Sequence, residues 1–356
     1  MDMQRRDPED EGRLAGAQAQ FGPGVTLSEP FPGRPPLWIE PADDTLGADL
    51  GAAVRWMAEH HGAVEEALLT FGAIVWRGFP VAESDDFAAL MGAFDVYAQG
   101  YTAGTTDRRP VKGQVMEATR TSPEVYILLH QEMSYLPHNP RLVAFFCKEP
   151  SPVGGETVIC DMRGLLEALP APLGRKLVRE GVLYRRNMRS EETSEDWRAD
   201  PVYRHPSWQY RFATGDRATV EAQLRERGVS FRWEDDGGLS FWTHLPGVTT
   251  HPVTGERLFF NQMTSQAQHR LSVGAARVDL INGAYGETVT RPYAVAFGNG
   301  EPLTDDEFMA IHEEFERRKV AFPWRPGDVM LVENKLTSHG RHPFSGPRDV
   351  QVMLLG

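Results

Sequence analysis

Cysteine, long apolar runs and positive charge are all scarce in this chain. The two cysteines, Cys147 and Cys160, lie in strand-like apolar stretches, which suits buried thiols in a reducing compartment better than a disulfide framework. No stretch approaches the ~20 apolar residues that cross a bilayer, and the charged segment 1–12 lacks a signal-peptide core. A net charge of −13 and a pI near 5.4 disfavour nucleic acid and anionic membranes. We therefore expect a cytoplasmic protein that binds neither.

The composition is that of an ordinary globular protein, with 41% apolar and 24% charged residues. Residues 1 to about 30 are polar and lack a sustained period, so we expect a disordered or loosely attached N-terminal arm. The rest of the chain shows no internal repeat. We expect residues 31–356 to form a single domain.

Hydrophobic periodicity predicts a mainly β core with flanking helices. Helical spacing occurs at 50–69, 83–97 and 305–319, the last with a capping box of Thr304 and Glu307. The strand-like runs fall into two groups, at 125–129, 142–147 and 157–160, and again at 328–333 and 350–355. The region at about 163–246 is more polar and separates the two groups. We expect it to be an inserted lid over one mouth of the core.

A candidate metal site begins at His130 and Glu132, which follow an apolar, strand-like run. Side chains two residues apart on a strand project to the same face, so both could bind one ion. Two histidines and one carboxylate form the facial triad of non-haem iron oxygenases, and His339 is the candidate third ligand. The alternative is that His339 is a core histidine and Glu132 a solvated charge at a strand edge. A buried carboxylate without a partner costs several kcal/mol, which favours the metal site.

Several segments together resemble the Fe(II)/2-oxoglutarate-dependent dioxygenases of the taurine dioxygenase (TauD/TfdA) superfamily. They are His130-x-Glu132, Gly154-Gly155-Glu156-Thr157, the distal His339, and Arg348 nine residues after it. The likeness is closest to the clavaminate-synthase-like and syringomycin-hydroxylase-like branch, through the segments 130–136 (HQEMSYL), 322–328 (FPWRPGD) and 339–348 (HGRHPFSGPR). The resemblance covers residues 32–355.

The resemblance implies a double-stranded β-helix, or jelly roll, with Fe(II) as cofactor and 2-oxoglutarate and O₂ as co-substrates. Arg348 would bind the distal carboxylate of 2-oxoglutarate, because a guanidinium offers two parallel donors. We expect the turn at 343–347 to place Arg348 at the start of the strand beside His339. Thr157 would donate its hydroxyl to the same carboxylate, unless it is there only because a β-branched residue suits a strand.

The implied reaction is hydroxylation of an unactivated C–H bond in an amino acid or a carrier-bound aminoacyl unit, in specialised-metabolite (for example antibiotic) biosynthesis. Asn261 and Arg341 are candidates for binding that small-molecule substrate, although Arg341 could equally pack its turn. The residues leave two alternatives open. One is desaturation or cyclisation by the same cofactor chemistry, and the other is a metal-binding jelly roll without oxygenase activity.

Overall fold

The computed structural model describes residues 8–99, 108–192, 207–285 and 291–356. Its largest sheet has eight strands in the order β1-β2-β3-β16-β7-β19-β5-β4. These strands are Val25–Ser28, Leu37–Pro41, Ala73–Trp76, Val329–Glu333, Leu142–Glu149, Asp349–Leu355, Val115–Glu117 and Pro110–Lys112 in that order. Chain segments that are far apart in sequence therefore alternate across it.

A smaller sheet faces the large one and completes the jelly roll. It contains β6 (Ile127–His130), β17 (Thr337–Arg341) and β9 (Thr157–Asp161), next to the short pair β8 (Val153–Gly154) and β18 (Phe344–Ser345). Ile159 of β9 packs in one buried cluster with Phe145 of β7 and Met330 of β16. This apolar layer between the sheets confirms the fold expected from the sequence.

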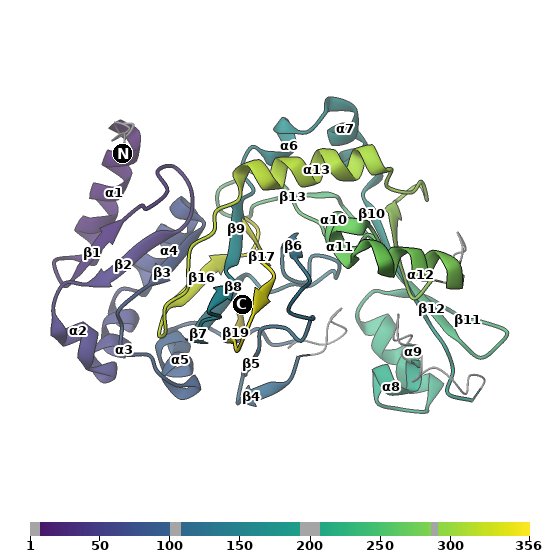
Figure 1. The fold of residues 1–356 in the computed structure, drawn as a ribbon, viewed down its shortest axis with the longest axis horizontal. Coiled ribbons are helices and arrows are strands. Elements are labelled where there is room, and N and C mark those ends of the chain that lie inside the picture. The colour runs from purple at the N-terminus through teal and green to yellow at the C-terminus, as the bar shows by residue number, and fades with distance from the viewer. Residues whose placement is uncertain (1–7, 100–107, 193–206, 286–290) are drawn as a thin grey trace.

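Helices cover the outer faces of both sheets (Figure 1). Those on the large sheet are α2 (Asp44–Ala48), α3 (Leu50–Glu59), α4 (His61–Phe71), α5 (Ser84–Leu90) and the short 3-10 helix η1 (Met91–Ala93). Those near the small sheet are α6 (Leu165–Ala168), α7 (Ala171–Glu180) and α13 (Asp305–Arg318). The capping box of Thr304 and Glu307 is present at the start of α13. The single helix expected at 50–69 is instead two helices that meet at His60.

A third sheet lies to one side of the jelly roll, at the right of Figure 1. Its order is β11-β12-β10-β15, with bounds Ser230–Trp233, Leu239–Leu245, Val182–Met188 and Tyr293–Phe297. The helices α8 (Trp208–Phe212) and α9 (Arg217–Glu226) pack against it. The remaining elements are β13 (Val248–Thr250), β14 (Arg257–Phe259), α10 (Met263–Gln266), α11 (Arg270–Val273) and α12 (Ala275–Tyr285). The region at 163–246 thus contains strands and a core of its own.

The N-terminal region differs from the predicted loose arm. Residues 1–7 lie outside the described residues, but α1 (Pro8–Phe21) is a helix and β1 pairs antiparallel with β2. Phe21, Val25 and Leu27 are buried in the same cluster as the helices on the large sheet. Burial of these apolar side chains stabilises the segment. The polar average composition of the segment does not predict this burial.

Both cysteines are buried and unpaired, as expected. Burial raises the pKa of each thiol to about 12, so neither is a reactive thiolate at neutral pH. Among the described helices, none is long and apolar enough to span a membrane.

Candidate metal centre and co-substrate clamp

Strand pairing brings two histidines together from distant parts of the chain. His130 is the last residue of β6, and the register of β6 with β17 places it directly opposite His339. Gly340 permits this close pairing, because a Cβ there would lie 2.5 Å from the carbonyl oxygen of Ile127. The two imidazole ring centroids are 4.5 Å apart.

Glu132 lies in the turn after β6 and is fixed by Asn334. Its backbone N–H donates to Asn334 Oδ1 at 2.7 Å, and Asn334 Nδ2 donates back to the Glu132 carbonyl at 2.9 Å. The backbone of Met133, the next residue, is left-handed, with φ of 55°. Glu132 therefore reaches the histidines from a fixed turn rather than from the continuous strand that the sequence predicted.

The charge states of these residues suit a bound cation. Burial and then the neighbouring His339 lower the pKa of His130 to about 4, so its ring is neutral at neutral pH. Nδ1 of His130 donates to the Leu128 carbonyl at 2.8 Å, which leaves the lone pair of Nε2 available. Burial alone would raise the pKa of Glu132, but Arg108, His339 and His130 hold it well below its usual value. Glu132 is thus a carboxylate, with Arg108 Nη2 at 2.8 Å from its Oε2.

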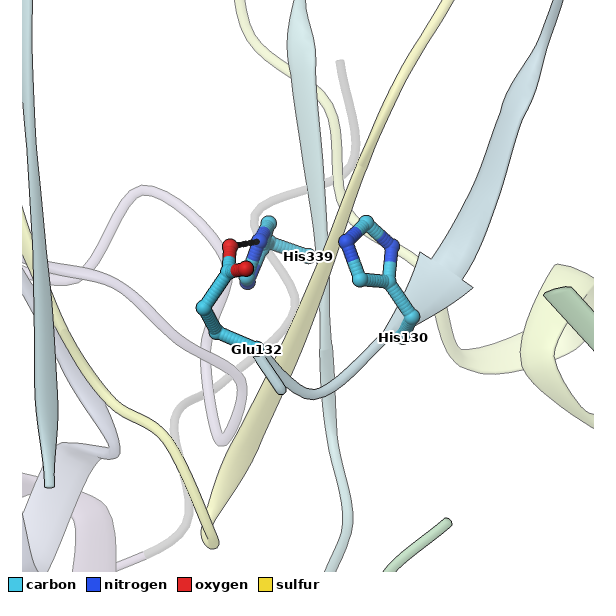
Figure 2. A group of neighbouring side chains, drawn as sticks. All are labelled: His130, Glu132 and His339. Carbon is cyan, nitrogen blue, oxygen red and sulfur yellow. Dashed lines mark ion pairs between the residues drawn. The ribbon is translucent and has the colours of Figure 1, made fainter. Parts of the chain in front are cut away.

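One donor atom from each of His130, Glu132 and His339 lies within 4.8 Å of the others. Figure 2 shows the three side chains converging on one space, with Nε2 of His339 at 3.5 Å from Oε2 of Glu132. The buried Nδ1 of His339 has no hydrogen-bond partner among the described residues. Two imidazoles and one carboxylate are the donor set of the iron facial triad, so the residues present fit an Fe(II) ion.

The triad lines a cavity of about 920 Å³ together with both predicted 2-oxoglutarate residues, Thr157 and Arg348. None of the described residues in the predicted lid region, 163–246, lines the cavity. Part of the wall comes from residues between Gln262 and Arg277 and from Tyr293. The loop after β5, residues 118–122, also lines the cavity.

Arg348 is the last residue of the turn between β18 and β19, immediately before β19. Its Nε donates to the Gly155 carbonyl at 2.9 Å, and a Cβ at residue 155 would lie 3.1 Å from the arginine side chain. The structure shows no hydrogen bond from its two terminal nitrogens to other described residues. The turn at 343–347 does not place Arg348 on the strand beside His339, because the following strand, β19, pairs with β7 and β5 in the large sheet. Arg348 and His339 nevertheless line the same cavity.

Thr157 is buried at the start of β9, and its hydroxyl oxygen accepts a hydrogen bond from Trp324 Nε1 at 3.1 Å. An indole N–H only donates, so the hydroxyl keeps its own proton for another acceptor. Thr157 therefore offers a hydroxyl proton whose direction is set by its hydrogen bond with Trp324.

The two predicted substrate-binding residues both form hydrogen bonds from their side chains to backbone groups. Asn261 donates to the Gly247 carbonyl at 2.7 Å and accepts from the Met263 N–H at 3.0 Å, and it does not line the cavity. Arg341 lines the cavity, but its terminal nitrogens donate to three loop carbonyls, those of Thr121, Ser122 and Val125. In the structure both side chains thus hold backbone segments in place.

Comparison with known proteins decides which family this geometry belongs to. The family model described as "Taurine catabolism dioxygenase TauD, TfdA family" matches residues 31–354. The chain belongs to the TauD/TfdA family. It is therefore an Fe(II)- and 2-oxoglutarate-dependent oxygenase, and the alternative of a jelly roll without oxygenase activity no longer holds.

Curated relatives of this family member include two of comparable length. A clavaminate synthase-like protein of Arabidopsis thaliana is 29% identical over 287 residues, which cover 80% of this chain and 81% of that protein. The dapdiamide synthesis protein DdaC of Enterobacter agglomerans is 26% identical over 304 residues, covering 85% and 88%.

Solved structures share the fold at low sequence identity. AAD-2 in complex with Mn(II) and N-oxalylglycine has a TM-score of 0.51 and 12% identity, with 93% of this chain and 96% of that chain covered. A taurine dioxygenase from Burkholderia xenovorans has a TM-score of 0.50 and 14% identity, with 94% and 90% covered.

Sequence reasoning missed three residues at the centre: Arg108, Asn334 and Trp324. Arg108 pairs with Glu132, Asn334 fixes the Glu132 turn, and Trp324 orients Thr157. Asn334 and Trp324 lie beside or within segments that carry family signal, but only their contacts reveal what they do.

Replacing Thr157 with valine is expected to raise the KM for 2-oxoglutarate by about tenfold, since a hydrogen bond to a charged group is worth about 1.5–3 kcal/mol. The same change leaves the buried Trp324 N–H without an acceptor, which should lower the free energy of unfolding by about 1–3 kcal/mol. Steady-state kinetics and urea denaturation measure the two effects.

Two controls separate these effects. Thr157→Ser keeps the hydroxyl and should leave both quantities near those of the wild type. Adding Trp324→Phe to Thr157→Val removes the orphaned N–H, so part of the stability should return while the KM stays high. A KM that returns together with the stability would show that Thr157 acts only through packing.

Arg341→Lys is expected to make the loop at 121–125 less ordered, because one ammonium group cannot replace a planar guanidinium that donates to three carbonyls. We expect the free energy of unfolding to fall by about 2 kcal/mol, with faster hydrogen exchange of the amides at 119–125. The exposed Arg325, changed to lysine, is the control. Unchanged exchange in Arg341→Lys would contradict this positioning role.

Proposed function

We propose that His130, Glu132 and His339 hold the iron, that Arg348 and Thr157 hold the distal carboxylate of 2-oxoglutarate, and that the enzyme hydroxylates a C–H bond of an amino acid or aminoacyl unit. One observation carries the proposal. The triad and both clamp residues, from four separate chain segments, line one cavity.

The side chains divide the work between binding and orientation. With Fe(II) bound at the triad, O₂ would be the oxidant of the C–H bond and 2-oxoglutarate the co-reductant that becomes succinate and CO₂. His130 offers a neutral nitrogen because Leu128 holds its other ring proton, and Arg108 keeps Glu132 ionised. Arg348 offers its terminal nitrogens and Thr157 its hydroxyl proton, which together fix the orientation of the co-substrate. Apolar wall residues such as Phe145 and Leu128 help to exclude water from the site.

The cavity and one relative support the substrate class. A volume of about 920 Å³ exceeds what 2-oxoglutarate needs and leaves room for a second small molecule. The relative DdaC is described as a dapdiamide synthesis protein, which is consistent with a role in specialised metabolism for this chain. The substrate is either free or presented by a carrier protein. Desaturation or cyclisation is the second candidate, because the same cofactor chemistry gives both.

The test is a panel of free amino acids and carrier-bound aminoacyl thioesters, incubated with Fe(II), 2-oxoglutarate and O₂. We expect one class to couple succinate formation to a product heavier by one oxygen atom. A product lighter by two hydrogen atoms would identify desaturation or cyclisation instead. Succinate coupled only to a molecule outside the panel, such as a sulfonate or phenoxyacetate, would overturn the substrate class and leave the oxygenase assignment intact.

A further inference from the structure

Arginine dominates the charged residues of the cavity wall, although the whole chain carries a net charge of −13. Of the described residues that line the cavity, six are arginines: Arg108, Arg109, Arg120, Arg277, Arg341 and Arg348. Among the described lining residues the only carboxylate is that of Glu132. The site is therefore a positive hollow in an otherwise acidic protein, and such a hollow concentrates anions.

Three of these arginines already have roles near the iron site. Arg108 pairs with Glu132, Arg341 donates to loop carbonyls, and Arg348 is the proposed clamp for 2-oxoglutarate. The other three, Arg109, Arg120 and Arg277, are exposed at the rim of the cavity. We call these three residues the rim arginines.

The rim arginines come from three different elements. Arg109 precedes β4, Arg120 lies in the loop after β5, and Arg277 is on α12. Only Arg120 has an ion pair that the structure describes, with Glu117 at 3.3 Å and both side chains about 40% exposed. A solvent-exposed pair of this kind is worth little, so Arg120 remains available to a ligand. Guanidinium groups from three chain segments thus line one cavity, and each offers paired donors to an oxyanion.

We propose that the rim arginines bind an oxyanion group of the prime substrate, while its reacting C–H bond points to the triad. This inference rests on the proposed function and adds a charge requirement to it. The oxyanion is either a side-chain carboxylate of a free amino acid or the phosphate of a carrier arm, since the same chemistry serves both. A cationic substrate would meet one carboxylate among the lining residues that the structure describes, that of Glu132, which Arg108 already neutralises.

The test uses two pairs of probes that differ mainly in charge: L-aspartate against L-asparagine, and 4′-phosphopantetheine against pantetheine. Binding is measured by calorimetry under argon with Fe(II) and saturating 2-oxoglutarate present. We expect the anionic member of at least one pair to bind about tenfold more tightly at low salt, and the advantage to shrink as ionic strength rises. Preference in the first pair indicates a free acidic amino acid, and preference in the second indicates a carrier arm.

Charge-reversal variants locate the site. Arg277→Glu and Arg109→Glu should each reduce the preference for the anionic probe several-fold. The matched control is Arg175→Glu, an exposed arginine on α7 that does not line the cavity, and it should keep the preference. Equal affinity within both pairs, including no binding of either member, would overturn the inference. So would an equal effect of Arg175→Glu.

Because 2-oxoglutarate is itself an anion, its affinity is measured separately in every variant. If the rim variants weaken 2-oxoglutarate binding but leave the preference between probes unchanged, the rim arginines serve only the co-substrate and the inference falls. A neutral or cationic amino acid that is hydroxylated efficiently would also refute the charge requirement, while the proposed function would stand.

Discussion

Replacing either His130 or His339 with alanine is expected to abolish 2-oxoglutarate turnover, to below about 1% of the wild-type rate, while the jelly roll stays folded. Removing even a residue that only supports a metal ligand typically costs 10–100-fold, and loss of a ligand itself costs more. The fold should persist, because the buried cluster between the sheets is built from other side chains. Succinate formation and far-UV circular dichroism measure the two outcomes.

The control for these variants is His138→Ala. His138 is exposed and lies six residues after Glu132, so its removal should leave turnover and circular dichroism unchanged. Wild-type turnover in both His130→Ala and His339→Ala would refute the triad. Loss of the folded spectrum would instead show that these histidines stabilise the β6–β17 pair.

Arg348→Ala is expected to raise the KM for 2-oxoglutarate by roughly ten- to a hundredfold, since a charge-assisted, two-donor contact is worth about 1.5–3 kcal/mol. The KM for the prime substrate should change much less. Arg348→Lys keeps the positive charge but lacks the paired donors of a guanidinium, so its KM for 2-oxoglutarate should lie between those of Arg348→Ala and the wild type. Steady-state kinetics with each substrate varied in turn measures both constants.

An unchanged 2-oxoglutarate KM in Arg348→Ala would mean that another arginine holds the co-substrate. The structure offers poor replacements, because Arg341 donates to three carbonyls and Arg108 pairs with Glu132. Burial, and then the neighbouring Arg341, lower the pKa of Arg348 to about 10. Arg348 is thus still cationic at neutral pH, but its charge is poorly solvated, and a carboxylate beside it would offset that cost.

Hydrophobic periodicity predicted a mainly β core with flanking helices, because strand-like runs are visible one segment at a time. The jelly roll itself was implied by the resemblance to the TauD/TfdA superfamily, which a small number of chemically unusual residues carries. The N-terminal helix was not predicted, since α1 is weakly amphipathic and its neighbours Val25 and Leu27 are buried only against a cluster formed later in the chain. Tertiary burial overrode local composition there.

Residues that position the centre are the ones that sequence reasoning missed. Asn334 bonds to Glu132 across 202 residues, and Trp324 to Thr157 across 167. No local pattern reports such pairs. Asn261 and Arg341 were predicted to contact substrate because they are polar and lie near a motif. In the fold they donate to the backbone carbonyls of Gly247 and Thr121, and the sequence alone does not show these contacts.

The most direct test of the central claim is the visible absorption of the Fe(II)–2-oxoglutarate chelate under argon. Adding Fe(II) and 2-oxoglutarate to the wild type should produce a weak visible charge-transfer band. His138→Ala should show the same band, His130→Ala and His339→Ala should not, and Arg348→Ala should require a higher concentration of 2-oxoglutarate. A full band in both triad variants would contradict the assignment of His130, Glu132 and His339 as the iron site.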